Sequence, residues 1–186
     1  PTAAALAYGF NKKKDEKIVV YDFCGGTFDV SVLEVAMGDA GELTIEVRST
    51  DGDSHMGGRD IDQKIVRYLA DEFKKQSGLD VTKDPLALQR LDEGAEKAKH
   101  ELSTGSETEV NIPFITVGSD GTPQHLLVKL SRSTLETLAE EYVTRSIDIT
   151  KRALEASGMS AGEIGEVILV GGQTRMPLIQ TEVEKL

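Results

Sequence analysis

The sequence is poor in cysteine and histidine and has no long apolar run. It contains one Cys, three His and no Trp among 186 residues. A single Cys excludes a framework of internal disulfides, and the scattered His residues leave no spacing typical of a zinc site. The longest apolar runs are about five residues, far below the ~18–20 that a membrane-spanning helix needs. The sequence therefore predicts neither a disulfide framework nor a membrane-spanning helix.

Positive charge is also scarce. The chain carries 21 Lys plus Arg against 32 Asp plus Glu, which gives a formal net charge of −11. Binding to a nucleic-acid backbone needs a basic patch. The only basic run, Lys12–Lys14, is followed at once by Asp15 and Glu16. We therefore expect no nucleic-acid partner, and the lack of long apolar runs predicts no membrane partner.

What is present is an ordinary globular composition, with 39% hydrophobic and 28% charged residues. The length suits one domain, or two small ones that share a core. The chain begins at Pro1 without a Met, and the helix pattern of Pro177–Leu186 reaches the end without a Gly or Pro terminator. We therefore expect the chain to be a piece of a longer one.

The first part of the chain follows the two-residue period of β-strands. Lys17–Asp22 and Phe28–Val35 predict two strands joined by a glycine turn, and Leu43–Val47 alternates with polar residues in a third. The three strands predict an antiparallel meander. An Ala-rich stretch, Thr2–Leu6, predicts a short helix before them, and Gly38–Gly41 predicts a turn.

The middle of the chain changes to a helical period. Apolar residues recur every four positions over Ile61–Phe73 and predict a helix that Gly78 ends. Asp84–Pro85 is a cap followed by a first-turn proline and predicts the start of a second helix. Alternating apolar residues in Val110–Phe114 and Leu126–Leu130 predict a β-hairpin.

The last part of the chain predicts further helices around one apolar strand. Ser133–Glu136 is a capping box that opens a long helix, and Ser160 starts a short helical turn. Val167–Val170 has no polar residue, so we expect it to be central in a sheet. A final helix starts near Thr174 and Pro177.

The order of these elements predicts an α/β protein with a smaller lobe. Residues 1–56 and 131–186 form the predicted core subdomain, and residues 57–130 form an inserted α+β subdomain.

The sharpest functional feature is Asp22–Asp29, a strand, a glycine turn and a second strand. The glycines Gly25 and Gly26 let backbone N–H groups approach phosphate oxygens. A carboxylate at the end of a buried strand can hold a hydrated Mg²⁺, and the Thr27 hydroxyl can orient a water molecule. The alternative is a plain β-hairpin with a glycine turn.

A second glycine pair, Gly171–Gly172, lies between the apolar strand and the last helix. Such a pair brings the backbone close to an anion or a nucleotide. Arg175 follows and can stack on a planar base. The alternative is an ordinary turn between a strand and a helix.

A third feature is a stripe of Glu96, Lys99 and Ser103 on the second helix, with steps of three and four residues. The stripe offers a carboxylate and an ammonium to ribose hydroxyls, and a hydroxyl to a base edge. The alternative is a solvated surface pair.

Cys24 is the remaining candidate group. Nothing in the spacing of His55, His100 and His125 points to a Cys–His nucleophile, so we expect Cys24 to have no catalytic role.

In these residues the sequence resembles the ATPase domain of the seventy-kilodalton heat-shock chaperones, in its bacterial DnaK form. The resemblance covers the whole chain. The segments that carry it occur in the order of the family: Pro1–Gly9, Asp22–Asp29, Gly57–Asp62, Glu96–Ser103 and Leu169–Pro177.

The resemblance implies the second lobe of an actin-like ATPase, with a ribonuclease-H-like core sheet and nucleotide between two lobes. It implies that Gly25 and Gly26 contact phosphates, and that Asp22, Thr27 and Asp29 order Mg²⁺, a monovalent cation such as K⁺ and the attacking water. ATP or ADP is the implied ligand. The groups implied to hold its ribose and adenine, or to line that pocket, are Glu96, Lys99, His100, Ser103, Gly171, Gly172, Gln173, Thr174 and Arg175.

Two positions depart from the family pattern, which has a third glycine in place of Cys24 and, in some relatives, Arg in place of His100. The first phosphate loop and the catalytic Lys belong to the other lobe, so the resemblance implies no ATP turnover by this chain alone.

The resemblance also implies a cytoplasmic location and several partners. These are a nucleotide-exchange factor of the GrpE type, a J-domain co-chaperone and unfolded client proteins. Two alternatives to a nucleotide-binding lobe stay open: a non-catalytic docking module for an exchange factor, and a lobe of a sugar kinase.

Overall fold

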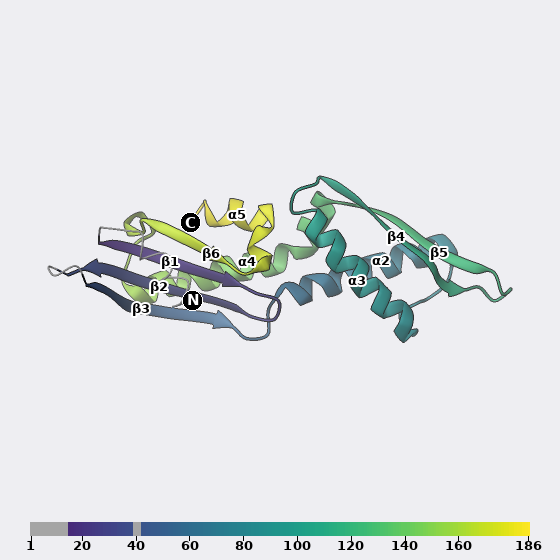
Figure 1. The fold of residues 1–186 in the computed structure, drawn as a ribbon, viewed down its shortest axis with the longest axis horizontal. Helices are drawn as coiled ribbons and strands as arrows, with labels where there is room; N and C mark the ends of the chain where they lie inside the picture. Colours follow the sequence, from purple (N-terminus) through teal and green to yellow (C-terminus); the bar gives the residue numbers. More distant parts are fainter. Residues whose placement is uncertain (1–14, 39–41) are drawn as a thin grey trace. The chain divides into compact units, whose positions relative to one another are not determined.

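The structure is a computed structural model that describes residues 15–38 and 42–186 (Figure 1). The predicted helix Thr2–Leu6 and most of the predicted turn Gly38–Gly41 lie outside the described residues. The chain divides into two compact units. The first comprises Pro1–Gly58 and Glu141–Leu186, and the second comprises Arg59–Glu140. No helix in the described ranges is long and apolar enough to cross a lipid bilayer.

A four-stranded mixed sheet forms the centre of the first unit. Strands β1 (Glu16–Phe23), β2 (Phe28–Met37) and β3 (Leu43–Asp53) are the antiparallel meander predicted from the sequence. Strand β6 (Glu166–Val170) pairs in parallel with β1, so the order is β3-β2-β1-β6 (Figure 1). The parallel pair places the carboxyl ends of β1 and β6 side by side, with Asp22 opposite Val170.

The middle of strand β1, Ile18–Tyr21, is buried because side chains pack on both of its faces. On one face Ile18 and Val20 form a buried cluster with Leu33 and Val35 of β2. On the other face Tyr21 packs edge-on against Phe28, with ring centroids 4.7 Å apart. Fully burying a side chain of this size contributes about 1.5–3 kcal/mol, so β1 fixes the position of the whole sheet.

The long helix α4 (Arg132–Ser157) binds the aromatic face of the sheet through a buried hydrogen bond. The oxygens of Tyr21 and Ser146 are 2.5 Å apart, and the Ser146 hydroxyl donates to the carbonyl of Val143. Burial raises the pKa of Tyr21 to about 12, although the hydrogen bond with Ser146 opposes the rise. Because the Ser146 hydroxyl already donates to Val143, Tyr21 is the donor in this pair, and it is neutral at pH 7.

The predicted central position of Val167–Val170 is wrong, because β6 lies at the end of the strand order within the described residues. Its apolar run has another physical cause, which is contact on both faces. Ile168 and Val170 pack against the Ile18–Val20 cluster. On the other face Val167 lines an apolar cavity with Leu154 of α4 and Val183 of helix α5 (Pro177–Val183).

The second unit contains two helices and a hairpin, as the sequence predicts. Helix α2 (Gly58–Ser77) ends before Gly78, which has a φ of +74°. Helix α3 (Pro85–Glu101) is capped by Asp84, whose carboxylate accepts hydrogen bonds from the N–H groups of Leu86 and Ala87. Strands β4 (Glu107–Val117) and β5 (Pro123–Ser131) pair in antiparallel fashion.

Phe114 does not occupy the core position that the alternation predicts for it. The pairing of β4 with β5 is irregular between Ile112 and Thr116. Ile115 is buried in its place, and Phe114 is 66% exposed with a φ of +53°. Two features account for this: Pro113 cannot donate to a ladder, and the guanidinium of the distant Arg90 binds the carbonyls of Pro113 and Phe114 at 2.7 and 2.9 Å.

Helix α4 begins at Arg132 rather than at the predicted capping box of Ser133–Glu136. The hydroxyl of Ser131 accepts a hydrogen bond from the N–H of Thr134 at 3.1 Å and so caps the helix two residues earlier. The helix ends before Gly158, which has a φ of +71°. The long helix was predicted correctly, but its cap was not.

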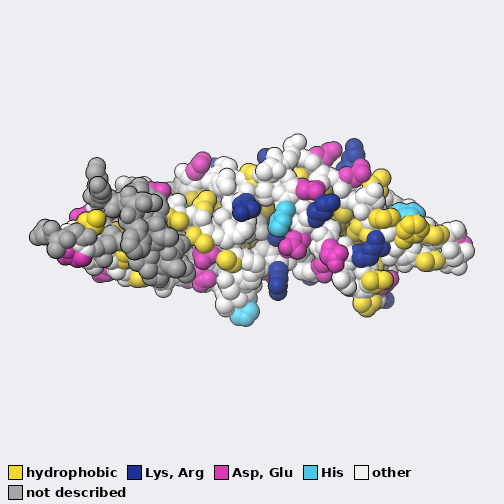
Figure 2. Space-filling model, viewed as in Figure 1, with side chains coloured by type: hydrophobic (Ala, Val, Ile, Leu, Met, Phe, Trp, Pro, Cys, Tyr) yellow, Lys and Arg dark blue, Asp and Glu magenta, His cyan; other side chains and the backbone are white. Residues whose placement is uncertain are grey.

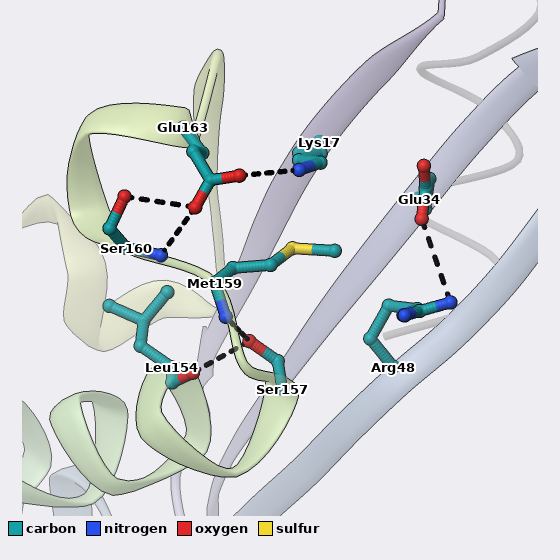
Figure 3. Close-up of polar contacts among 8 residues, drawn as sticks. All are labelled: Lys17, Glu34, Arg48, Leu154, Ser157, Met159, Ser160 and Glu163. Atoms are coloured by element: carbon teal, nitrogen blue, oxygen red, sulfur yellow. Dashed lines mark hydrogen bonds and ion pairs between the residues drawn. The ribbon is translucent and has the colours of Figure 1, made fainter.

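The short helical turn predicted at Ser160 is present as η1 (Ala161–Glu163) and is tied to β1 (Figure 3). The Glu163 carboxylate accepts hydrogen bonds from the N–H and the hydroxyl of Ser160, both at 2.9 Å. It also pairs with the Lys17 ammonium at 2.7 Å. These groups, with Lys17 the largest contributor, lower the pKa of Glu163 to about 2.

The lowered pKa of Glu163 gives a first prediction. Glu163→Gln should lower the melting temperature at pH 7, because the neutral amide loses the pairing that favours the carboxylate. The ordinary pKa of this group is 4.5, so its contribution is complete above that pH and is lost as the pH falls towards 2. The difference in melting temperature between the two proteins should therefore shrink between pH 5 and pH 2 in thermal unfolding followed by circular dichroism.

Glu155→Gln is the matched control, because Glu155 is an exposed carboxylate near the end of α4. It should change the melting temperature little at any pH. A Glu163→Gln difference that is independent of pH would contradict the assignment.

Candidate functional site

The predicted phosphate-binding residues lie at the carboxyl end of β1. Asp22 of β1 and Asp29 of β2 are directly paired in the antiparallel register. Directly opposite residues in such a pair project to the same face of the sheet. Asp22 is half-buried and Asp29 is exposed. The register thus brings together two carboxylates that are seven positions apart in the sequence.

The turn between the two carboxylates is exposed and free of side-chain bulk. The N–H of Cys24 donates to the carbonyl of Thr27 at 3.0 Å, which closes the turn around Gly25 and Gly26. A Cβ atom at Gly25 or Gly26 would meet no atom within 4 Å. The two glycines therefore face open space on the side where a Cβ atom would project.

Gly57 packs against the backbone of this turn, although no pattern in the sequence indicated this role. A Cβ atom at Gly57 would lie 2.4 Å from the carbonyl carbon of Gly25 and from the nitrogen of Gly26. The N–H of Gly58 also donates to the carbonyl of Cys24 at 2.9 Å. Only glycine allows this approach, so the start of α2 fixes the turn.

Cys24 occupies the position of the third family glycine without backbone strain. Phe114 is the only non-glycine residue with a positive φ in residues 15–38 and 42–186, so Cys24 is not left-handed. Its thiol donates to Oδ1 of Asp22 at 3.0 Å. This hydrogen bond, partial burial and the negative charges of Asp22 and Asp29 raise the pKa of the Cys24 thiol above its ordinary value.

The second glycine pair lies directly beside the end of β1. Gly171 has a φ of +90°, and a Cβ atom there would lie 2.2 Å from the carbonyl oxygen of Phe23. Gly172 begins the short helix η2 (Gly172–Arg175) and has open space around its Cα. Arg175 is exposed. The two predicted glycine turns therefore lie at the same edge of the sheet.

Gln173 and Thr174 of the predicted set are buried within this loop, each 6% exposed. The Thr174 hydroxyl donates to the carbonyl of Gly171 at 2.7 Å. The amide of Gln173 lies 3.8 Å from the sulfur of Met176. In the structure both side chains stabilise the loop, and their contact with a ligand stays a prediction.

The predicted adenosine-binding residues lie in the second unit, along α3. Glu96 and His100 are exposed, whereas the Lys99 side chain is only 12% exposed. Ser103 follows the end of the helix, and its hydroxyl donates weakly to the carbonyl of Lys99 at 3.4 Å. The spacing of the stripe thus survives in the structure, but Lys99 is not the solvated group that a surface stripe implies.

The partner of Lys99 is Asp62 of α2, which sequence reasoning did not single out. The Lys99 Nζ lies 2.8 Å from Oδ1 of Asp62, and the Asp62 side chain is 15% exposed. Burial raises the pKa of Asp62, and the Lys99 ammonium opposes the rise. The segment Gly57–Asp62 was noticed as a motif, but nothing in the sequence pairs Asp62 with a residue 37 positions later.

The carboxylates at the end of β1 fit a hydrated Mg²⁺. No group of three or more His, Cys, Asp or Glu side chains gathers around a metal position in the described ranges. Mg²⁺ needs no such group, since it favours one or two carboxylates together with waters and substrate phosphates. Asp22 and Asp29 supply that number of oxygen ligands beside an exposed turn. They are the residues that would hold the ion.

Glycine turns at the carboxyl end of adjacent strands are typical of α/β proteins that bind an anionic ligand at this edge. The model of the Hsp70 protein family matches the chain over residues 1–186. The chain belongs to the Hsp70 family. Its mixed α/β fold is that of an actin-like ATPase lobe, and the match assigns it to part of a chaperone nucleotide-binding domain. Members of this family bind ATP or ADP with Mg²⁺ and work with co-chaperones and client proteins.

The close approach of Gly171 to β1 gives a second prediction. Gly171→Ala should lower the free energy of unfolding by at least about 1–2 kcal/mol, because a side chain is disfavoured at this φ and collides with the Phe23 carbonyl. Gly172→Ala is the matched control, since its Cβ meets nothing within 4 Å. Urea unfolding measures both. Equal values for the two variants would show that the loop moves away from β1.

The environment of Cys24 gives a third prediction. The rate of its reaction with iodoacetamide should rise with pH around a midpoint above the value of about 8.5 for an ordinary thiol, because Asp22 disfavours the thiolate. Asp22→Asn should lower this midpoint, whereas Asp120→Asn, in the β4–β5 turn, should not. The rates are measured by mass spectrometry of the alkylated chain. A midpoint unaffected by Asp22→Asn would refute the hydrogen bond.

Proposed function

We propose that this chain binds ATP or ADP as one side of the nucleotide cleft of an ATP-dependent protein-folding chaperone. The observation that carries the proposal is the edge of the sheet at the end of β1. There the exposed turn Cys24–Thr27, the paired carboxylates Asp22 and Asp29, and the loop beginning at Gly171 lie together.

The phosphates are proposed to bind the backbone of Gly25 and Gly26. Exposed backbone N–H groups in a turn form an anion-binding concavity, and a Cβ atom at either glycine would meet no atom within 4 Å. Two nearby carboxylates would repel a triphosphate unless a cation lay between them. Asp22 and Asp29 are therefore proposed to hold Mg²⁺ through water, with K⁺ as a further ion.

Mg²⁺ supplies charge neutralisation to the phosphates when it is bound. The residues of the chain have the simpler tasks of orientation and electrostatic stabilisation, on which phosphoryl transfer to water largely depends. The Thr27 hydroxyl, which is half-buried beside the turn, is proposed to orient the attacking water. Asp22 and Asp29 are proposed to accept hydrogen bonds from waters at this edge.

Ribose and adenine are proposed to bind Glu96, Lys99, His100 and Ser103. Gly171, Gly172 and Arg175 are also proposed to contact the adenosine, with Gln173 and Thr174 supporting their loop. The exposed Arg175 guanidinium suits stacking on a flat base. Glu96 offers a carboxylate to ribose hydroxyls, because its side chain is exposed on α3.

From the resemblance of the motifs we further propose that the chain comes from a DnaK-type parent, forms the second lobe of its ATPase domain and is cytoplasmic. A GrpE-type exchange factor and a J-domain co-chaperone are the proposed partners. We also propose the division of residues 1–56 and 131–186 as core subdomain from residues 57–130 as the inserted one.

A second candidate function is docking of an exchange factor on the second unit. Large apolar side chains are exposed there over α3, β4 and β5 (Figure 2). They are Leu86 at 68%, Phe114 at 66%, Val117 at 62% and Leu127 at 51%. Exposed apolar groups of this kind suit a protein partner. The sugar-kinase alternative gains no support from the Hsp70 match.

The nucleotide proposal gives a fourth prediction. In ¹H–¹⁵N NMR spectra, titration with Mg²⁺–ADP should shift the signals of Gly25, Gly26, Glu96, Lys99, Ser103 and Arg175. The dissociation constant should be near millimolar, about −4 kcal/mol, because one side of a cleft leaves most of the ligand in water. Lys99→Ala should weaken binding about tenfold, since it removes a charged hydrogen-bond donor.

Lys97→Ala is the matched control for this titration. Lys97 is an exposed lysine of the same helix, and its nearest acidic partner is Glu101 at 3.8 Å. Its loss should leave the dissociation constant unchanged. The absence of ADP-dependent shifts at these residues would contradict the proposed site.

A further inference from the structure

The ion pair between α2 and α3 has unusually little exposure for a pair on neighbouring helices. The Asp62 and Lys99 side chains are 15% and 12% exposed, with Oδ1 and Nζ 2.8 Å apart. Most of the other ion pairs in the described ranges have both side chains more than a quarter exposed, as in Lys17–Glu163 and Arg152–Asp51. Removing two charges from water costs free energy, so the position of this pair points to a role other than stabilising the fold.

Charge, rather than a directed hydrogen bond, compensates the buried Asp62 carboxylate. Its Oδ1 is enclosed and accepts no hydrogen bond of good geometry from the described residues. The carboxylate therefore depends on the Lys99 ammonium for its neutralisation.

Asp62 also lies among the proposed adenosine-binding residues. Glu96 is close enough for its negative charge to raise the pKa of Asp62 further, and His100 is close enough to lower it. Asp62 and Glu96 line the same groove of about 280 Å³ between α2 and α3. The α3 stripe therefore has a fourth member, which comes from a different helix.

A second contact keeps the two helices in register at this place. Gln63, the residue after Asp62 in α2, donates a hydrogen bond from its side-chain amide to Oδ1 of Asp92 in α3 at 2.7 Å. Because α2 and α3 are fixed to each other there, Asp62 can set the direction of the Lys99 side chain. The ion pair, with Nζ and Oδ1 2.8 Å apart, holds the end of the Lys99 side chain beside Asp62.

We propose that Asp62 is a positioning residue, which directs the Lys99 ammonium towards the ribose hydroxyls of the bound nucleotide. This inference rests on the proposed nucleotide site. Asp62 itself does not contact the nucleotide. Without the Asp62 carboxylate, the Lys99 side chain turns out to solvent, and the ribose loses a charged donor.

Asp62→Asn tests this role, because the amide has nearly the same shape but no charge. The dissociation constant of Mg²⁺–ADP should rise about tenfold, the same factor as for loss of the charged donor. In wild type the ¹⁵Nζ signal of Lys99 should be observable as an ion-paired ammonium that exchanges slowly with water. In Asp62→Asn this signal should broaden or disappear.

Asp62→Glu is the second variant, and it keeps the charge and with it the fold. Its carboxylate is displaced by one methylene group, so ADP binding should weaken by about threefold through misdirection of Lys99. Asp71→Asn is the matched control, since Asp71 is an exposed residue of the same helix. It should preserve both the Lys99 signal and the affinity for ADP.

The outcomes separate this inference from the proposed function. Wild type without any ADP-dependent shift would overturn both. Wild-type affinity for ADP in Asp62→Asn and Asp62→Glu, in a chain that does bind ADP, would overturn only the positioning role. An equal loss of affinity in Asp71→Asn would do the same, because it would reveal a general effect of charge.

Discussion

The end of strand β1 is enclosed by two glycines that approach it more closely than any side chain permits. Gly57 touches the backbone of Gly25 and Gly26, and Gly171 touches the carbonyl of Phe23. These contacts bring three separate segments of the chain to one edge of the sheet. The turn at Gly25 and Gly26 can stay exposed and still keep a fixed shape, because backbone rather than flexible side chains supports it.

The same edge concentrates negative charge, and that has consequences for any ligand. Asp22 and Asp29 face each other across the β1–β2 pair, and the Cys24 thiol keeps its proton beside them. A phosphate group that enters this edge adds further negative charge. A bound cation is the simplest remedy, because Mg²⁺ accepts ligands from carboxylates and phosphates together. The carboxylates of β3 are instead neutralised by arginines of helix α4, because Arg145 pairs with Asp53 and Arg152 with Asp51.

The sequence predicted the elements well where local patterns decide them. The caps at Asp84 and Gly78 and the alternation in β1 and β2 depend on neighbouring residues only. Predictions failed where distant partners decide. Phe114 leaves the core because Arg90, 24 residues away, binds its carbonyl, and no local pattern records that contact.

The candidate site divides in the same way. Glycine turns and paired carboxylates carry their chemistry in a short segment, so Asp22–Asp29 could be recognised directly. The apolar run of β6 reports only that its two faces are covered, and this does not fix its place in the strand order. Gly57 and Asp62 act through residues that are far away in the sequence, so their roles needed the structure.

The segment Gly57–Asp62 illustrates why a family motif can lack an obvious chemical group. Gly57 has no side chain, and this lets it approach the backbone of Gly25 and Gly26. Asp62 has a charged side chain that is mostly buried and directed at Lys99. Both residues lie against groups that are proposed to bind nucleotide. A motif of this kind constrains backbone approach and counter-charge, and substitution at either position should disturb binding without removing any ligand contact.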